Sequence, residues 1–127
     1  MDKLNENLSV SNAQRARELG GEFDRVVSLS SPNEHTTHKH LIDDGEHDYG
    51  KFRDAVEDVI KGLENDEDVL VHCMAGISRS VSVCIAALTV HESMDYDTAY
   101  NTCRRGFQHP DPSLIDSVKK YIEEKKE

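Results

Sequence analysis

Cys73 and Arg79 are the residues whose types and spacing most clearly indicate chemistry. They enclose the loop from Met74 to Ser78, which contains one glycine, Gly76. The apolar run Val69-Leu70-Val71 precedes the loop and a longer apolar stretch follows it, which indicates a buried strand and then a buried helix. The backbone N–H groups of such a loop, with the positive end of the helix dipole, form a cradle for an anion. The sequence therefore predicts a phosphate-binding loop.

Within this cradle the side chains supply the reactive groups. A positive environment favours the thiolate of Cys73 over the thiol, and the thiolate is the nucleophile. Arg79 presents a planar fork that matches two phosphate oxygens. Ser80 can donate a hydrogen bond to the sulfur, and Gly76 permits torsions or close approaches that a side chain would obstruct. A buried structural cysteine is the alternative for Cys73, but it leaves the other three residues unexplained.

The run VHCMAGISRS resembles the H-C-x-x-G-x-x-R-S signature of the cysteine-dependent protein phosphatases, and it is most similar to the dual-specificity branch. The resemblance extends weakly to FDRVVSL, to the stretch from Asp48 to Leu63, and to RRGFQHPDPSL. It implies two-step hydrolysis of phosphomonoesters through a phosphocysteine intermediate.

The same resemblance implies a role for each residue of the signature. Cys73 would be the nucleophile and Arg79 the clamp on the phosphate. Ser80 would assist departure of the thiolate in the second step. His72 would tune the nucleophile through hydrogen bonds to the loop, and a satisfied core histidine is the alternative for it. The substrate cradle would consist of the backbone N–H groups of Met74, Ala75, Gly76, Ile77, Ser78 and Arg79.

The mechanism also requires a general acid, which the family takes from an aspartate on a loop well before the cysteine. The corresponding loop here runs from Leu41 to Asp48. Asp44, just before a flexible glycine, is the main candidate, and Asp43 could do the same work. Asp48 is better explained as a helix cap, and Glu46 and His47 remain open.

Two further stretches bear on the site. His35, His38, His40 and His47 suggest a metal site, but no cysteine accompanies them, so we expect structural or surface histidines and neither a metal nor a cofactor. The family commonly has a proline–asparagine pair that braces the phosphate loop, where this chain has Pro110-Asp111. Asp111 or His109 could take over that brace.

The surrounding pattern predicts an α/β fold, in which a small, partly parallel central sheet is flanked by helices. We expect residues 1–127 to form a single catalytic domain like that of the dual-specificity phosphatases. The predicted strands are Phe23 to Leu29, His38 to Ile42, and Val69 to Val71. The predicted helices are Asn12 to Leu19 capped by Ser11, Tyr49 to Leu63 capped by Asp48, the stretch after Arg79, Asp95 to about Arg105, and one that starts at Pro112.

Composition restricts the function classes. The 127 residues carry 25 acidic and 15 basic side chains, a net charge of −10, which argues against nucleic-acid and anionic-membrane partners. The apolar run from Val81 to Val90 is too short to span a bilayer, and the N-terminus lacks a secretory signal. Three cysteines do not suggest a disulfide framework. We expect a cytoplasmic monomer.

The loop sequence also indicates the substrate. Between Cys73 and Arg79 there is no lysine or second arginine, which points away from polyanionic substrates. The short chain leaves no room for the added loop that gives tyrosine-specific relatives a deep pocket. We therefore expect a protein phosphatase acting on phosphotyrosine and also on phosphoserine and phosphothreonine. A phosphate-binding pseudo-phosphatase and a small-molecule phosphatase are the alternatives.

Overall fold

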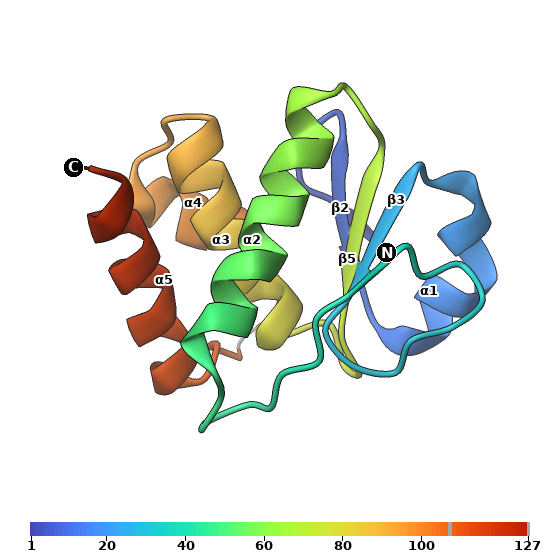
Figure 1. Cartoon of the computed structure of the whole chain (residues 1–127), viewed down its shortest axis with the longest axis horizontal. Coiled ribbons are helices and arrows are strands. Elements are labelled where there is room, and N and C mark those ends of the chain that lie inside the picture. The colour runs from blue at the N-terminus through green and yellow to red at the C-terminus, as the bar shows by residue number, and fades with distance from the viewer. Residues whose placement is uncertain (107, 127) are drawn as a thin grey trace.

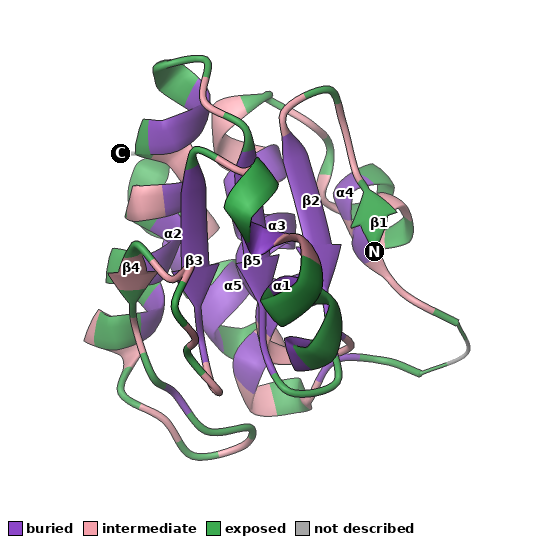
Figure 2. Cartoon of the chain, turned by 90° about the vertical axis from the view of Figure 1, so that its right-hand side faces the viewer, coloured by how far each residue is buried: buried purple, intermediate pink, exposed green. Residues whose placement is uncertain are grey.

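Three buried parallel strands form the centre of the fold. The computed structural model describes residues 1–106 and 108–126. Strand β5 (Val69–His72) lies between β2 (Leu8–Ser11) and β3 (Arg25–Ser28), and every residue of the three strands is buried (Figure 2). Short edge strands complete the order β1-β2-β5-β3-β4, with β1 (Asp2–Lys3) antiparallel to β2 and β4 (His38–Lys39) parallel to β3. The predicted α/β class is confirmed.

Helices cover both faces of this sheet (Figure 1). One face carries the short helix α1 (Ala13–Leu19), followed by a 3-10 turn at Gly20–Glu22. The other face carries α2 (Tyr49–Glu64), α3 (Arg79–His91), α4 (Tyr96–Cys103) and α5 (Pro112–Lys125). Helix α3 packs against α2, α4 and α5 and is buried nearly all round, as its apolar sequence predicted.

The register of the strands positions the loop that follows β5. His72 is paired with Ser11 on one side and with Ser28 on the other, so the three strands end together. Cys73 is the next residue, and it leaves the sheet at this carboxyl edge. In open α/β sheets, ligands bind at the carboxyl ends of the strands, and the predicted phosphate loop lies at this edge.

Some element boundaries differ from the predictions. The cap of α1 is Asn12, whose side chain accepts the N–H of Arg15, and not Ser11, which is the last residue of β2. Neither N-terminal strand was predicted: β1 is only two residues long, and alternate serines make the LSVS of β2 look polar. Strands β3 and β4 are shorter than predicted, and α4 ends at Cys103 because Arg104 is extended. The segment RRGFQHPDPSL includes Phe107, which lies outside the described residues.

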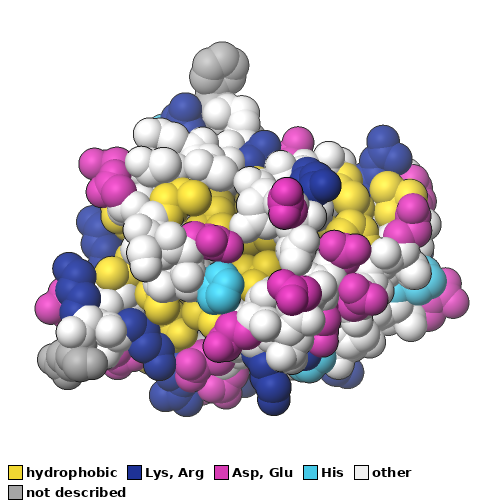
Figure 3. Space-filling model, turned by 90° about the horizontal axis from the view of Figure 1, so that it is seen from above, with side chains coloured by type: hydrophobic (Ala, Val, Ile, Leu, Met, Phe, Trp, Pro, Cys, Tyr) yellow, Lys and Arg dark blue, Asp and Glu magenta, His cyan; other side chains and the backbone are white. Residues whose placement is uncertain are grey.

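The surface agrees with the acidic composition. In Figure 3, acidic side chains lie across the middle of the face that is seen from above, and basic side chains lie mainly at its edges. Among residues 1–106 and 108–126, no helix combines the length and the apolar character that a membrane crossing requires.

Candidate active site

The sulfur of Cys73 lies at the floor of the loop between β5 and α3. The residue is 2% exposed. Its Sγ is 3.2 Å from Ser80 Oγ, in the first turn of α3, and it accepts the backbone N–H of Gly76 at 3.3 Å. The loop therefore curls around the sulfur, with one backbone N–H directed at it and the Ser80 hydroxyl of α3 beside it. A thiolate at this position would accept a hydrogen bond from both groups, which stabilises negative charge on sulfur.

The path of the loop depends on its contact with the end of β2. Gly76 has φ of +74°, and a Cβ added there would lie 2.7 Å from the carbonyl carbon of Ser11. On the same side, Ala13 donates its N–H to the carbonyl of Met74 at 3.0 Å. The β2–α1 junction therefore shapes the loop, and only glycine fits at this position. Nothing in the sequence indicated this contact.

Arg79 reaches from the start of α3 to the loop before α2. Its side chain is 16% exposed, its Nη1 donates to the carbonyl of Ile42 at 3.1 Å, and its Nε lies 3.7 Å from Asp44 Oδ2. Among the described residues, no hydrogen-bond partner is present for the buried Nε. The guanidinium thus keeps donors that the protein does not use.

A pocket opens beside Arg79. It is lined by Leu29, Ser30, Ser31, Leu41, Ile42, Asp43 and Arg79. Leu41, which lines the pocket, is 46% exposed, and Met74 in the phosphate loop is 59% exposed. Ser31 Oγ, 3.7 Å from Met74 Sδ, links the pocket to the phosphate loop. The Asp44 side chain is 52% exposed, so solvent and ligands can reach its carboxylate.

His72 is completely buried at the end of β5. Its Nε2 lies 2.6 Å from Ser28 Oγ on the neighbouring strand, and Ser28 Oγ lies 2.7 Å from Thr36 Oγ1. Burial lowers the pKa of His72, and the neighbouring backbone of Cys73 offsets part of this effect. The imidazole is therefore neutral near pH 7. The shortest contact of His72 is within the sheet and not with the loop.

The brace of the phosphate loop comes from the backbone of Asp111. Its N–H donates to Ser78 Oγ at 2.9 Å, whereas its carboxylate caps α5 by accepting the N–H of Ser113. Hydrogen bonds from Ser113 lower the pKa of Asp111, so the carboxylate is ionised. The other candidate, His109, instead contacts the Tyr100 hydroxyl at 2.6 Å.

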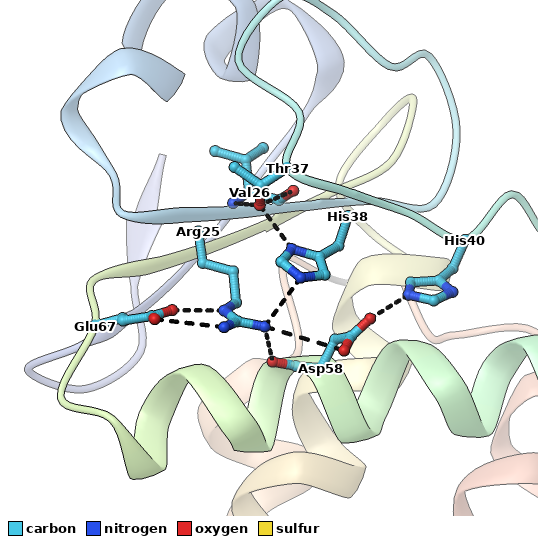
Figure 4. Close-up of polar contacts among 7 residues, drawn as sticks. All are labelled: Arg25, Val26, Thr37, His38, His40, Asp58 and Glu67. Carbon is cyan, nitrogen blue, oxygen red and sulfur yellow. Dashed lines mark hydrogen bonds and ion pairs between the residues drawn. The ribbon is translucent and has the colours of Figure 1, made fainter.

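The remaining histidines belong to other contacts. His38 and His40 lie beside Arg25 and Asp58, respectively (Figure 4). His35 lies 3.8 Å from Glu34. Across residues 1–106 and 108–126, no group of three or more histidine, cysteine or acidic side chains is arranged to hold a metal ion.

Comparison with known proteins gives one consistent family. Residues 8–124 match the family described as "Dual specificity phosphatase, catalytic domain". A putative tyrosine phosphatase of Invertebrate iridescent virus 6 is 32% identical over 109 residues, which are 81% of this chain and 77% of the viral protein. A probable dual specificity protein phosphatase of Dictyostelium discoideum is 34% identical over 86 residues, but the chain spans only 22% of it.

Solved structures share the fold. Human DUSP28 superimposes with a TM-score of 0.81 over 98% of this chain and 96% of the human chain, at 20% identity. The active form of Tk-PTP has a TM-score of 0.72 over 97% of this chain and 95% of its own, at 19% identity.

Proposed function

Because the chain belongs to the dual specificity phosphatase family, we propose that residues 1–127 form one catalytic domain that hydrolyses phosphotyrosine, phosphoserine and phosphothreonine in proteins. The observation that carries this proposal is the environment of Cys73. Its sulfur accepts the N–H of Gly76, contacts the Ser80 hydroxyl and lies at the carboxyl edge of the sheet, and the nearby arginine has an Nε without a hydrogen-bond partner among the described residues. This arrangement suits a thiolate that attacks a bound phosphate.

In the first step, Cys73 Sγ attacks phosphorus, and the bond from phosphorus to the ester oxygen breaks. Asp44 donates its proton to the departing oxygen, leaving a phosphocysteine. In the second step, Asp44 accepts a proton from water as that water attacks phosphorus, and the P–S bond breaks. Ser80, 3.2 Å from the sulfur, donates a hydrogen bond to the departing thiolate.

Arg79 binds the equatorial oxygens of the phosphate in this mechanism, together with the N–H groups of the loop. Its unpartnered Nε supports the assignment, because a buried donor without an acceptor costs free energy that an arriving oxyanion recovers. The hydrogen bond from Nη1 to the Ile42 carbonyl leaves the other guanidinium N–H groups available.

We assign the general acid to Asp44 and not to its neighbour Asp43. Asp44 is the carboxylate paired with Arg79, so it lies next to the group that holds the phosphate, whereas Asp43 lines the side of the pocket. Asp44→Asn should lower kcat for phosphotyrosine peptides about 10²–10⁴-fold, the usual contribution of a general acid, while Asp43→Asn should retain most of the activity. The reverse result would move the assignment to Asp43.

The rim of the pocket supports phosphoproteins as substrates. Leu41 at the pocket and Met74, which contacts Ser31 of its lining, offer apolar contact to a tyrosyl ring or to aliphatic neighbours of a phosphorylated residue. Among the described residues that line the pocket there is no lysine. We propose further that the protein acts as a cytoplasmic monomer. A net charge of −10 opposes self-association, and three free cysteines suit a reducing compartment.

Hydrolysis of p-nitrophenyl phosphate across pH by the wild type and by Cys73→Ser tests the proposal. In the wild type we expect a bell-shaped dependence of the rate on pH and inhibition by vanadate, and in the variant we expect no turnover.

A panel of phosphopeptides, sugar phosphates and nucleotides then separates the alternatives. A wild type that binds phosphopeptides without turnover would support a pseudo-phosphatase. Turnover of sugar phosphates or nucleotides but not phosphopeptides would indicate a small-molecule phosphatase.

A further inference from the structure

The loop that bears Asp44 is attached to helix α5 by two side chains of that helix. Ser113 Oγ lies 2.5 Å from the carbonyl oxygen of Gly45, and Ser117 Oγ lies 2.7 Å from His47 Nε2. His47 Nδ1 in turn lies 2.6 Å from the same Gly45 carbonyl. The residue next to the candidate acid is thus held from two directions.

The donors in this cluster follow from the chemistry of its atoms. A carbonyl oxygen only accepts, so His47 Nδ1 carries the proton that it donates to Gly45. In the neutral ring, Nε2 then accepts the hydroxyl proton of Ser117, which is 8% exposed. The ring also packs against Phe52, at a centroid distance of 6.0 Å. His47 therefore bridges the loop and α5 through both of its ring nitrogens.

The same end of α5 reaches the phosphate loop. Ser113 Oγ lies 2.7 Å from the carboxylate of Asp111 as well as 2.5 Å from the Gly45 carbonyl, and its one proton serves these acceptors in turn. The N–H of Asp111 donates to Ser78 Oγ at 2.9 Å. The first turn of α5 consequently connects the loop of the acid with the loop of the nucleophile.

Gly45 gives this attachment its importance. Its φ is +68°, and nothing lies within 4 Å of where its Cβ would be, so no atom packs against this side of the backbone next to Asp44. The carboxylate of Asp44 is 52% exposed, and within residues 1–106 and 108–126 its one ion pair is the 3.7 Å contact with Arg79. The hydrogen bonds to the Gly45 carbonyl are therefore the main restraint on the loop immediately after the acid.

We propose that His47, Ser113 and Ser117 are positioning residues that hold the Asp44 carboxylate where it protonates the leaving oxygen. The inference rests on the proposed function. It adds to that function a set of residues outside the phosphate cradle, which the loop N–H groups and Arg79 form. Without the attachment, Asp44 remains present but is misplaced at the moment of bond cleavage. Reactions that need the proton most then lose the most rate.

The leaving group distinguishes this role from a structural one. A phenol of low pKa departs without help, whereas the hydroxyl of tyrosine, with a pKa of about 10, requires protonation. A general loss of folded enzyme lowers both rates by the same factor. Loss of acid positioning lowers the rate for the poor leaving group alone.

The experiment measures kcat/KM for a series of aryl phosphates, from dinitrophenyl to phenyl phosphate, with Ser113→Ala, Ser117→Ala and His47→Ala. We expect about a 10-fold loss on phenyl phosphate and less than about a 2-fold loss on dinitrophenyl phosphate, a fraction of the full effect of a general acid. Ser113→Thr and Ser117→Thr keep the hydroxyls and should restore the phenyl phosphate rate. Equal losses across the series, or no loss, would overturn the inference.

Two control variants distinguish a positioning role from a general effect of removing a hydroxyl and from failure of the proposed function. Thr102→Ala removes a hydroxyl that donates to the Thr98 carbonyl within α4, so it should leave the whole series unchanged. Asp44→Asn should show the steepest dependence on the leaving group. If Asp44→Asn is steep and the α5 variants are flat, the proposed function stands and the positioning role fails. An inactive wild type would instead remove the proposed function.

Discussion

Two nearly buried arginines lie at different places in the fold: Arg25 is the first residue of β3, whereas Arg79 begins α3, after the loop that follows the end of β5. The side chain of Arg25 on β3 is 10% exposed, and its Nε and Nη2 donate to the two carboxylate oxygens of Glu67 at 2.5 and 3.4 Å (Figure 4). Its Nη1 donates to the Asp58 carbonyl at 3.3 Å and to His38 Nε2 at 3.2 Å. The side chain of Arg79 is 16% exposed, and among the residues that the structure describes it has one hydrogen bond, to the Ile42 carbonyl, and a looser ion pair with Asp44.

The difference shows how the fold uses a buried guanidinium. An uncompensated buried charge costs several kcal/mol, so it needs acceptors from the protein or from a ligand. Glu67, Asp58 and His38 supply these acceptors to Arg25, which joins β3, β4 and α2. Arg79 has an unpartnered Nε within the described part of the chain, beside a pocket and a cysteine. The first arginine holds the fold together, and the second is placed to bind an oxyanion.

The largest expected effect is the loss of activity when Arg79, the arginine with an unpartnered Nε, is replaced. Arg79→Lys should lower kcat/KM for p-nitrophenyl phosphate about 10²–10³-fold, as for the loss of a donor to transition-state charge. The melting temperature should change little, because the substitution removes only the contacts of Arg79 with Ile42 and Asp44. Steady-state kinetics and a thermal melt measure both. Retained activity would contradict the assignment.

Replacement of Arg25, whose N–H groups have protein acceptors, should lower stability and not activity. Arg25→Gln should lower the free energy of unfolding by about 2–4 kcal/mol, somewhat less than for a fully buried pair because Glu67 is partly exposed. kcat for the folded fraction should stay within a few-fold of the wild type. Urea unfolding, with activity measured below the transition, checks this. A variant that is stable but inactive would erase the contrast between the two arginines.

A third variant tests how tightly the Arg25 cluster is packed. A Cβ on Gly62 of α2 would lie 2.7 Å from Val69 Cγ2 and 2.8 Å from Arg25 Cδ. Overpacking of this kind costs about 1–3 kcal/mol and exceeds the gain of up to about 1 kcal/mol from alanine in a helix. Gly62→Ala should therefore lower the midpoint of urea unfolding. A higher midpoint would mean that Arg25 and Val69 can move to make room for the added methyl group.

The smallest effect is a dependence of stability on pH. Burial lowers the pKa of His38 below its ordinary 6.5, and in the fold its Nε2 accepts from Arg25. The unfolded chain therefore binds the proton first as the pH falls, so stability is complete above pH 6.5 and decreases below it. Burial lowers the pKa of His72 in the same direction. Denaturant melts between about pH 7.5 and about pH 5.5 should show the loss, and His38→Asn should reduce it. A wild-type stability that does not change between these pH values would contradict the prediction.

The fold was predictable where the signals are local. The spacing of apolar residues after Asp48 predicted α2 and its cap, and the consecutive apolar residues of VLV predicted β5 as a central strand. Strand β2 was not predictable because LSVS becomes a buried strand only by pairing with β5, which lies far along the chain. The Arg25 cluster was missed for the same reason, since Arg25 and Glu67 are 42 residues apart.

The candidate site divides in the same way. Cys73, Gly76, Arg79 and Ser80 lie within one loop and one helix turn, so their spacing alone brings them together. The contacts of Gly76 with Ser11, of Arg79 with Ile42, and of Gly45 with Ser113 join distant segments. No short pattern encodes such contacts, because they depend on the order of the strands and on where α5 packs.

Tungstate binding in the absence of turnover tests the contrast between the two arginines most directly. Isothermal titration would compare Cys73→Ser with the double variants that add Arg79→Lys or Arg25→Lys. We predict that Cys73→Ser binds the oxyanion, that Arg79→Lys weakens binding about 10–100-fold, the value of hydrogen bonds to a charged group, and that Arg25→Lys leaves the affinity unchanged. Equal affinity in the Arg79→Lys variant, or equal loss in both, would contradict the account.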